Sequence, residues 1–320
     1  MSVRRARVVE RVLTRLKFRQ LRLLVAIVKF GNIQRAAREV NASQPAATRM
    51  IKDLELDFEV RLFERTNRGM VPTVFGEALV RHTRLIFAQV ANAAQELADI
   101  NEGTSGRLVV GTLLAASTQL LPVAIDILVE QRPNVAIKVV EGTNEILMPA
   151  LQSGEIDMVV GRLSTYRHRA EIIQEKLFDD KVIVVGGARH PLVGRANLTF
   201  DKLKPFGWIL PPPETNLRRQ VDKFFVENDQ YMPPVILDSV SYLTNRTVLQ
   251  SRHLIGIMPS QVPAQDIATG FLSHIDWTIP FGSGPIGVSY RLHGELSPAG
   301  KAFLKALREA AAKLPINVAI

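Results

Sequence analysis

The stretch from Asn32 to Glu55 constrains the fold of this chain more than any other, because it holds two short helical patterns joined by a tight turn. In each pattern the apolar residues recur every three or four positions and so share one side of a helix. They are Ile33, Ala36, Ala37 and Val40 in the first helix and Ala47, Met50, Ile51 and Leu54 in the second. Asn32 and Ser43 stand at N-cap positions, and Pro45 lies in a first turn, where its missing N–H costs nothing. This pattern predicts a helix-turn-helix.

The outward positions of the second helix carry side chains suited to nucleic acid. They are Gln44, Thr48, Arg49 and Lys52. Amide, hydroxyl and cationic groups contact base edges and phosphates. The alternative is a helical hairpin inside a larger core. The charge distribution favours the first interpretation, because residues 1–84 contain 18 Lys and Arg against 8 Asp and Glu, whereas the rest of the chain has 22 against 23.

A basic segment attached to a nearly neutral body predicts a polyanionic partner for that segment, and double-stranded DNA fits it best. A membrane surface is the competing polyanion, but an amphipathic membrane helix favours Trp, and this region has none. The sequence contains no run of about 18 apolar residues, so no membrane span is expected. The chain has no cysteine, which excludes disulfides and thiolate metal sites and fits the reducing cytoplasm.

The segments on either side of the motif predict further parts of a DNA-binding domain. Residues 1–17 form a basic N-terminal extension, expected to be a DNA-contacting arm or a solvated, partly disordered tail. A backing helix runs from Phe18 to Phe30. Residues 58–76 predict a β-wing, with Leu62 and Phe63 anchoring a hairpin whose turn carries polar and basic residues. These turn residues are Arg65, Thr66, Asn67, Arg68 and Gly69. An ordinary solvated turn is the alternative.

A long helix is expected from Val74 to Ile100, with Thr73 as its cap. Its apolar residues recur every three to seven positions: Leu79, Ile86, Val90, Ala93, Leu97 and Ile100. Such a helix is about 40 Å long at 1.5 Å per residue. A one-sided helix of this length favours a partner helix and therefore a dimer seam. Packing on the chain's own C-terminal body is the alternative.

These motifs resemble the N-terminal domain of the LysR-type transcriptional regulators. The shared features are the AA of the first helix, the SQP opening the second, the LE closing it, the LFER segment and a T-x-x-G at the long helix. The resemblance is close from Phe18 to Leu79. It implies a winged helix-turn-helix at 18–75, a linker and dimerisation helix with a hinge at 76–106, and a homodimer that assembles into a homotetramer.

The sequence departs from the family pattern at a few positions: Asn32 and Ile33 replace the usual Ser and aromatic residue, Thr48 replaces a Ser, and Pro72 replaces a Leu. None of these changes removes a donor from the second helix. The N-terminal extension is also longer than is usual for the family.

From Leu108 onward, strand and helix patterns alternate, which predicts parallel sheets with helices on both faces. Strands are expected at 108–113, 136–142, 158–163, 182–187, 208–210, 254–259 and 287–292, and helices at 119–131, 145–153, 216–228, 241–250 and 298–313. The whole is an α/β multidomain protein. The second half resembles the two-lobed, periplasmic-binding-protein-like effector domain of the same family, with lobe I at 107–179 and 284–320 and lobe II at 180–283.

In such a domain a ligand lies where strand carboxyl ends face helix N-termini, whose free N–H groups favour anions. The candidate effector-binding residues are Ala115, Ala116, Ser117, Thr118, Thr143, Arg162, Pro212, Thr215 and Asn216. A plain N-cap is the alternative for each capping residue, and a structural salt bridge is the alternative for Arg162. Residues 189–219 further resemble regulators related to the galactose-binding-protein regulator, which implies a sugar or organic acid as effector.

The expected function is a sequence-specific DNA-binding regulator switched by a small-molecule effector. The candidate DNA-binding residues are Arg35, Ser43, Gln44, Pro45, Thr48, Arg49, Lys52, Arg65, Asn67 and Arg68. The alternative is a cytoplasmic small-molecule-binding protein with only nonspecific DNA affinity. We expect no enzyme, cofactor or metal site: the histidines lack ligand spacing, and the glycines at 282, 284 and 287 precede a strand pattern rather than the helix that a dinucleotide site requires.

Overall fold

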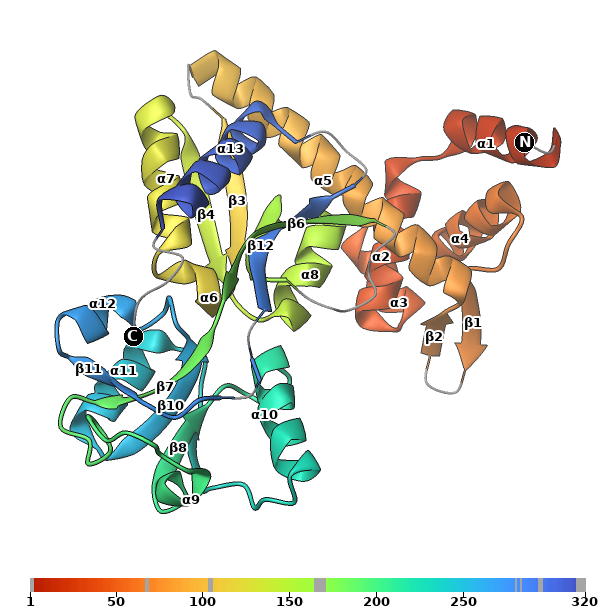
Figure 1. Cartoon of the computed structure of the whole chain (residues 1–320). Helices are drawn as coiled ribbons and strands as arrows, with labels where there is room; N and C mark the ends of the chain where they lie inside the picture. The colour runs from red at the N-terminus through yellow and green to blue at the C-terminus, as the bar shows by residue number, and fades with distance from the viewer. Residues whose placement is uncertain are drawn as a thin grey trace. The chain divides into compact units, whose positions relative to one another are not determined.

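The computed structural model describes residues 3–66, 69–102, 106–163, 171–279, 281–282, 284–292 and 296–314. The chain divides into two compact units, Met1–Ala93 and Ala94–Ile320 (Figure 1). Within the described ranges, no helix has the length and apolar character needed to cross a membrane.

The first unit is a helical domain with a two-stranded wing. Its elements are α1 (Val3–Arg15), α2 (Phe18–Phe30), α3 (Ile33–Glu39), α4 (Gln44–Phe58), β1 (Phe63–Thr66), β2 (Gly69–Pro72) and α5 (Val74–Glu102), which continues into the second unit. The strands β1 and β2 pair antiparallel. The expected helix-turn-helix, wing and long helix are confirmed. The N-terminal extension, expected to be a DNA-contacting arm or a solvated, partly disordered tail, folds as a helix from Val3 to Arg15.

Local hydrogen bonds explain why these helices begin and end where they do. The Asn32 side chain accepts hydrogen bonds from the amides of Gln34 (2.8 Å) and Arg35 (3.1 Å), which begins α3. The Ser43 hydroxyl accepts one from the Ala46 amide at the start of α4 (3.4 Å). Gly31 ends α2 in the left-handed conformation at φ 62°, which glycine adopts without strain.

The buried faces of α2, α3 and α4 form the core of this unit. The buried members are Leu23, Leu24, Ala26, Ile27, Ala36, Ala37, Val40, Ala47, Ile51, Leu54, Leu62, Phe63 and Val80. The predicted apolar stripes of both short helices therefore face inward. Leu62 and Phe63 anchor the wing to the core, as expected.

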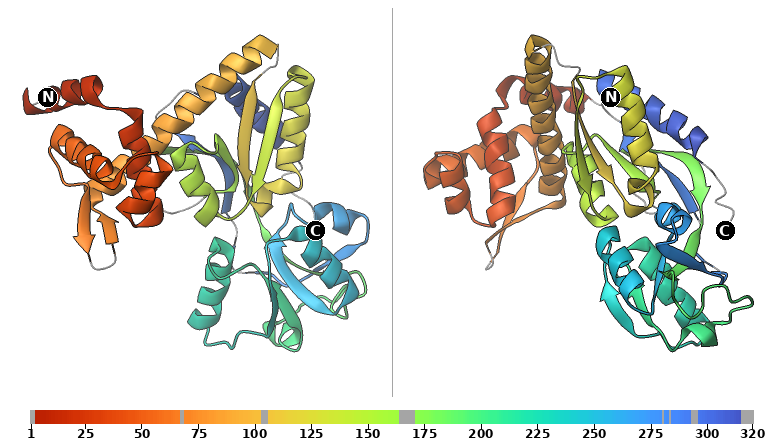
Figure 2. Two further views of the ribbon diagram at one scale, coloured as in Figure 1. Left: turned by 180° about the vertical axis from the view of Figure 1, so that it is seen from behind. Right: turned by 90° about the vertical axis from the view of Figure 1, so that its left-hand side faces the viewer.

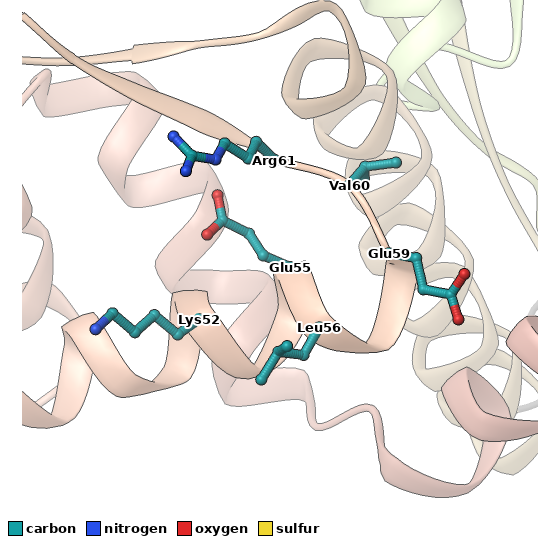
Figure 3. A pocket seen from close by; sticks show the side chains of 6 residues that line it. All are labelled: Lys52, Glu55, Leu56, Glu59, Val60 and Arg61. Atoms are coloured by element: carbon teal, nitrogen blue, oxygen red, sulfur yellow. The ribbon is translucent and has the colours of Figure 1, made fainter.

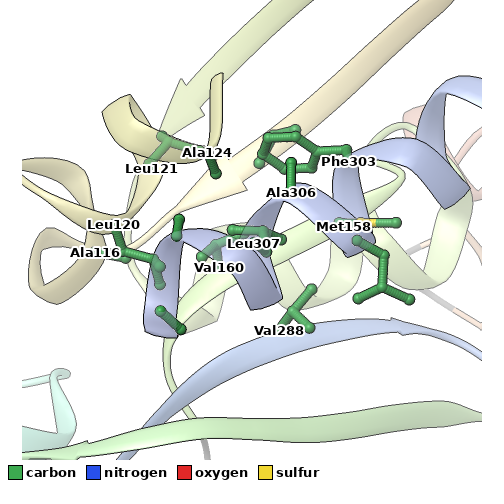
Figure 4. Packing of buried hydrophobic residues seen from close by; sticks show 14 of the residues in the cluster. Ala116, Leu120, Leu121, Ala124, Met158, Val160, Val288, Phe303, Ala306 and Leu307 are labelled. Carbon is green, nitrogen blue, oxygen red and sulfur yellow. The ribbon is translucent and has the colours of Figure 1, made fainter. Parts of the chain in front are cut away.

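Lobe I of the second unit is built on a five-stranded sheet of order β4-β3-β5-β12-β6. Its elements are β3 (Arg107–Thr112), α6 (Leu114–Ser117), α7 (Leu120–Gln131), β4 (Ala136–Glu141), α8 (Asn144–Ser153), β5 (Met158–Arg162), β6 (Ile172–Asp180), β12 (Gly284–Arg291) and α13 (Pro298–Lys313). The helices α7 and α13 pack together over the sheet, with Phe303 and Leu307 in a cluster that includes Ala124 and Val160 (Figure 4).

Lobe II holds a second five-stranded sheet, of order β11-β7-β10-β8-β9. Its elements are β7 (Val182–Gly187), α9 (Phe200–Leu203), β8 (Gly207–Leu210), α10 (Asn216–Glu227), β9 (Val235–Asp238), α11 (Tyr242–Ser251), β10 (Leu254–Pro259), α12 (Ala264–Ala268) and β11 (Leu272–Ile275). Figure 2 shows both sheets from two further directions. The chain passes from one sheet to the other between Asp180 and Val182 and returns before Gly284.

Two expectations about the sheets are corrected. Both sheets are mixed: in lobe I, β3 runs parallel to β4 and β5, but β12 runs antiparallel to β5 and β6. In lobe II, β7 runs antiparallel to β10 and β11. The sequence patterns also missed β6, β9 and β11. All three are edge strands, which are short or partly polar and so carry a weak apolar signal.

Candidate DNA-binding surface and effector site

The helix α4 presents a row of polar side chains opposite its buried face. Gln44, Arg49 and Lys52 are exposed, and Thr48 is half-buried, with its hydroxyl donating to the Gln44 carbonyl at 3.0 Å. Ser43 and Pro45 are exposed at its N-terminus, and Arg35 is exposed on α3. Apart from Arg35, these cationic and amide groups project from one helix, which is the form of surface that enters a major groove.

The wing is tied to the same helix. The Glu55 carboxylate accepts hydrogen bonds from the amides of Leu62 (2.8 Å) and Phe63 (3.4 Å), so α4 holds the first residues of the wing directly. Arg65 is exposed on β1, whereas Asn67 and Arg68 lie outside the described residues. The sequence interpretation missed the role of Glu55, although it is the acidic residue of the LE pair.

An open pocket lies beside the C-terminal half of α4. It is lined by Lys52, Glu55, Leu56, Glu59, Val60 and Arg61 (Figure 3). Its walls carry both signs of charge and it is open to solvent, so it lacks the enclosed form of a small-molecule site. The pocket belongs to the joint between α4 and the wing.

Two of the candidate effector residues are buried rather than available to a ligand. Ala115 and Ala116 are 5% and 0% exposed and belong to the lobe I core, because the loop after β3 folds as the short helix α6 and packs against β5. The Ala116 amide donates to the Leu113 carbonyl at 2.9 Å. In this structure these two side chains therefore expose almost no surface to a ligand, and their place in the effector site stays a prediction.

The candidate residues at the N-terminus of α10 have structural partners. Thr215 caps α10: its hydroxyl donates to the Pro212 carbonyl (2.8 Å) and accepts from the Arg218 amide (3.3 Å). Asn216 accepts a hydrogen bond from the Arg219 side chain. These contacts fit the N-cap alternative.

The remaining candidates lie in lobe I. The Ser117 hydroxyl donates to the Leu114 carbonyl (3.0 Å), and Thr143 is the N-cap residue of α8. The Thr118 hydroxyl donates to the Gln261 carbonyl at 3.0 Å and so links lobe I to lobe II.

Arg162 and Asp180 form a buried ion pair where the lobes meet. Arg162 ends β5 and Asp180 ends β6, with Arg162 Nη2 and Asp180 Oδ2 3.6 Å apart and only 14% and 1% of the side chains exposed. The Ser260 hydroxyl donates to Asp180 Oδ1 at 2.6 Å. The salt bridge named as the alternative for Arg162 is therefore present.

This ion pair leaves hydrogen-bonding capacity unused. Within the described part of the chain, Arg162 Nη2, Asp180 Oδ2 and Gln261 Oε1 are buried without hydrogen-bond partners. Burial raises the pKa of Asp180 and lowers that of Arg162, and in each case it outweighs the attraction of the opposite charge. The lobe junction thus holds both donors and acceptors that a polar ligand can satisfy.

A winged helix-turn-helix joined to a two-lobed α/β domain defines a ligand-responsive DNA-binding protein. The chain belongs to the LysR family: residues 18–77 match the bacterial regulatory helix-turn-helix protein of the lysR family, and residues 101–312 match the LysR substrate binding domain. It is a DNA-binding transcriptional regulator with an effector-binding domain.

Named relatives and solved structures agree with this placement. The chain is 30% identical over 300 residues to the HTH-type transcriptional regulator PcaQ of Agrobacterium fabrum, covering 94% of this chain and 96% of that protein. It is 30% identical over 298 residues to GbpR of Azospirillum brasilense, covering 92% and 87%. The structure of full-length CbnR bound to its target DNA shares the fold, with a TM-score of 0.60, 20% identity and coverage of 92% and 100%.

Proposed function

We propose that this regulator recognises the bases of its operator with α4 and that the wing makes additional contacts with the same DNA. In this assignment Gln44, Thr48 and Arg49 contact base edges, while Lys52 and Arg35 hold phosphates. Ser43 and Pro45 form the N-terminus of α4, which faces the DNA in this assignment. From the wing, Arg65, Asn67 and Arg68 contact the DNA. The observation that carries the proposal is the row of polar side chains on α4 opposite its buried face.

The functional parts follow from this assignment. Residues 18–75 bind DNA, 76–106 link and dimerise, and the effector lobes are 107–179 with 284–320 and 180–283. The protein acts in the cytoplasm, as a regulator without catalytic activity. The alternative is a small-molecule-binding protein with nonspecific DNA affinity. Titration of its own upstream DNA against an unrelated duplex at one salt concentration separates the two, since a specific regulator prefers its site by about a thousand-fold or more.

We propose a homodimer that forms through α5, and the family resemblance implies its further assembly into a homotetramer. Ile86, Val90 and Leu97 lie along one side of α5 and are 37%, 50% and 69% exposed. Apolar side chains at this spacing are covered when a second α5 packs along them.

Val90→Asp is expected to weaken dimerisation by about 3 kcal/mol, because it places a carboxylate without a partner charge inside the seam. Sedimentation velocity over a concentration series measures the change. Asn92→Asp adds the same charge at an exposed position on the other side of α5 and is the matched control. If both variants dimerise like the wild type, the seam lies elsewhere.

For the effector we propose a sugar or a small organic acid bound between the lobes. The chemistry at the junction supports this class, because the guanidinium of Arg162 can hold a carboxylate or a hydroxyl oxygen. The buried acceptors on Asp180 and Gln261 can in turn receive hydroxyl protons. Binding there would change the relative placement of the lobes and, through α5, that of the paired DNA-binding domains.

Arg162→Ala is expected to abolish the response to effector while DNA binding remains. A gel-shift assay with a panel of aldoses and small organic acids finds the responsive compound with the wild type and then tests the variant. Arg308→Ala, which removes a surface arginine of the same lobe paired with Glu175, is the control. A full response in Arg162→Ala would exclude an effector contact, and loss of DNA binding as well would make Arg162 purely structural.

A further inference from the structure

The helix α1 precedes the segment at 18–77 that matches the family's helix-turn-helix, and it packs against α4 (Figure 1). We propose that α1 is a positioning element for DNA recognition, in which Arg11 clamps the C-terminal end of α4. The inference rests on the proposed role of α4 as the reading helix. In this role the N-terminal extension contributes to DNA recognition without contacting the DNA itself.

Arg11 caps the end of α4. Its Nε and Nη2 atoms donate to the carbonyl oxygen of Asp57 at 3.1 and 2.7 Å, and Nη2 also donates to the Glu59 carboxylate at 3.0 Å. The Asp57 carbonyl is one of the last four of α4, which have no amide partner within the helix. A guanidinium there both satisfies the carbonyl and favours the negative end of the helix dipole.

The end of α4 has a backbone cap of its own, in which the Glu59 amide donates to the Glu55 carbonyl, but it has no local side-chain cap for the Asp57 carbonyl. The last turn of α4 contains no basic residue, and Glu59, its C-cap, adopts the left-handed conformation at φ 56°. Glutamate is strained in that region, so contacts that hold it there are needed. Arg11, 48 residues earlier in the chain, supplies one of them.

One face of α1 is docked on the DNA-binding domain. Its residues Val8 and Val12 are half-buried, and Leu16, just after it, packs against the core cluster of the DNA-binding domain. Arg11 itself is only 25% exposed. Val8, Arg11 and Val12 thus share the half-buried face of α1.

Clamping this end sets the orientation of the reading helix. The last turn of α4 is held by Arg11 from α1 and by the Glu55 bonds to the wing. The 15 residues of α4 span about 22 Å, so a tilt of about 5° moves one end by about 2 Å relative to the other. Side chains that contact base edges lose their geometry with displacements well under that size.

The test compares Arg11→Met with Arg7→Met in the full-length protein. Arg7 is an exposed arginine of the same helix, so the control removes the same charge without removing the clamp. The probes are a duplex enriched from random-sequence DNA by the wild-type protein and an unrelated duplex of equal length. We expect Arg11→Met to lose about tenfold in affinity for the enriched duplex and about twofold or less for the other.

Hydrogen exchange provides the second readout. Amides in the last turn of α4 should exchange faster in Arg11→Met and not in Arg7→Met. Arg11→Lys keeps the charge but lacks the planar fork, so it should also lose specificity, and it tests the proposal even where the Met variant unfolds. Equal losses in the Met variants, or wild-type specificity in Arg11→Lys, would overturn the clamp. Failure of the wild type to enrich any duplex would instead overturn the assignment of α4.

Discussion

Replacing Asp180 with alanine is expected to lower the free energy of unfolding of the effector-binding unit by about 3–5 kcal/mol. The substitution leaves the guanidinium of Arg162, with a side chain only 14% exposed, without its carboxylate 3.6 Å away. It also removes the acceptor of the Ser260 hydroxyl. Urea unfolding of the full-length protein measures the loss, followed by fluorescence of Trp208 and Trp277, the two tryptophans of the chain, both in lobe II.

Two controls test whether the loss of stability comes from leaving a buried charge without its partner. Asp201→Ala breaks the exposed pair between Asp201 and Lys204 and should cost less than about 1 kcal/mol. The double variant Arg162→Met/Asp180→Leu should recover most of the stability, because apolar replacement of a buried pair also removes its desolvation cost. The raised pKa of Asp180 and the lowered pKa of Arg162 point the same way, since both mean that burial penalises the charges. A double variant as unstable as Asp180→Ala would show that the pair contributes net stability.

Gln44→Ala is expected to lower affinity for the operator by about 1–3 kcal/mol and affinity for unrelated DNA much less. Gln44 is exposed at the first position of α4, where a side-chain amide can donate to and accept from one adenine. The Thr48 hydroxyl donates to the backbone carbonyl of Gln44 and not to the Gln44 side chain. The Gln44→Ala variant therefore keeps this hydrogen bond.

Fluorescence anisotropy at one salt concentration measures both affinities. Gln89→Ala, which removes an exposed amide from α5, should bind both duplexes like the wild type. Equal losses of Gln44→Ala on the two duplexes would show that Gln44 does not read bases.

Features encoded within a few residues were predictable from the sequence. Asn32 and Ser43 cap the helices that follow them through bonds only two or three residues long, and Gly31 ends α2 by its own conformation. The apolar spacing of α4 determined which side is buried, and therefore which side carries Arg49 and Lys52. These properties depend on helix geometry, which the sequence pattern expresses directly.

Features that depend on contacts between distant segments were decided only by the tertiary structure. Arg11 bonds a carbonyl 46 residues away, and Arg162 meets Asp180 because two strand ends converge at the lobe junction. Ala115 and Ala116 were predicted to lie in a loop, but they are buried because this segment folds as α6 and packs against β5. The edge strand β6 went unpredicted, because its polar pattern becomes a strand only when β12 supplies the hydrogen bonds. Local patterns specify the elements, whereas pairing, burial and charge partners arise only when those elements meet.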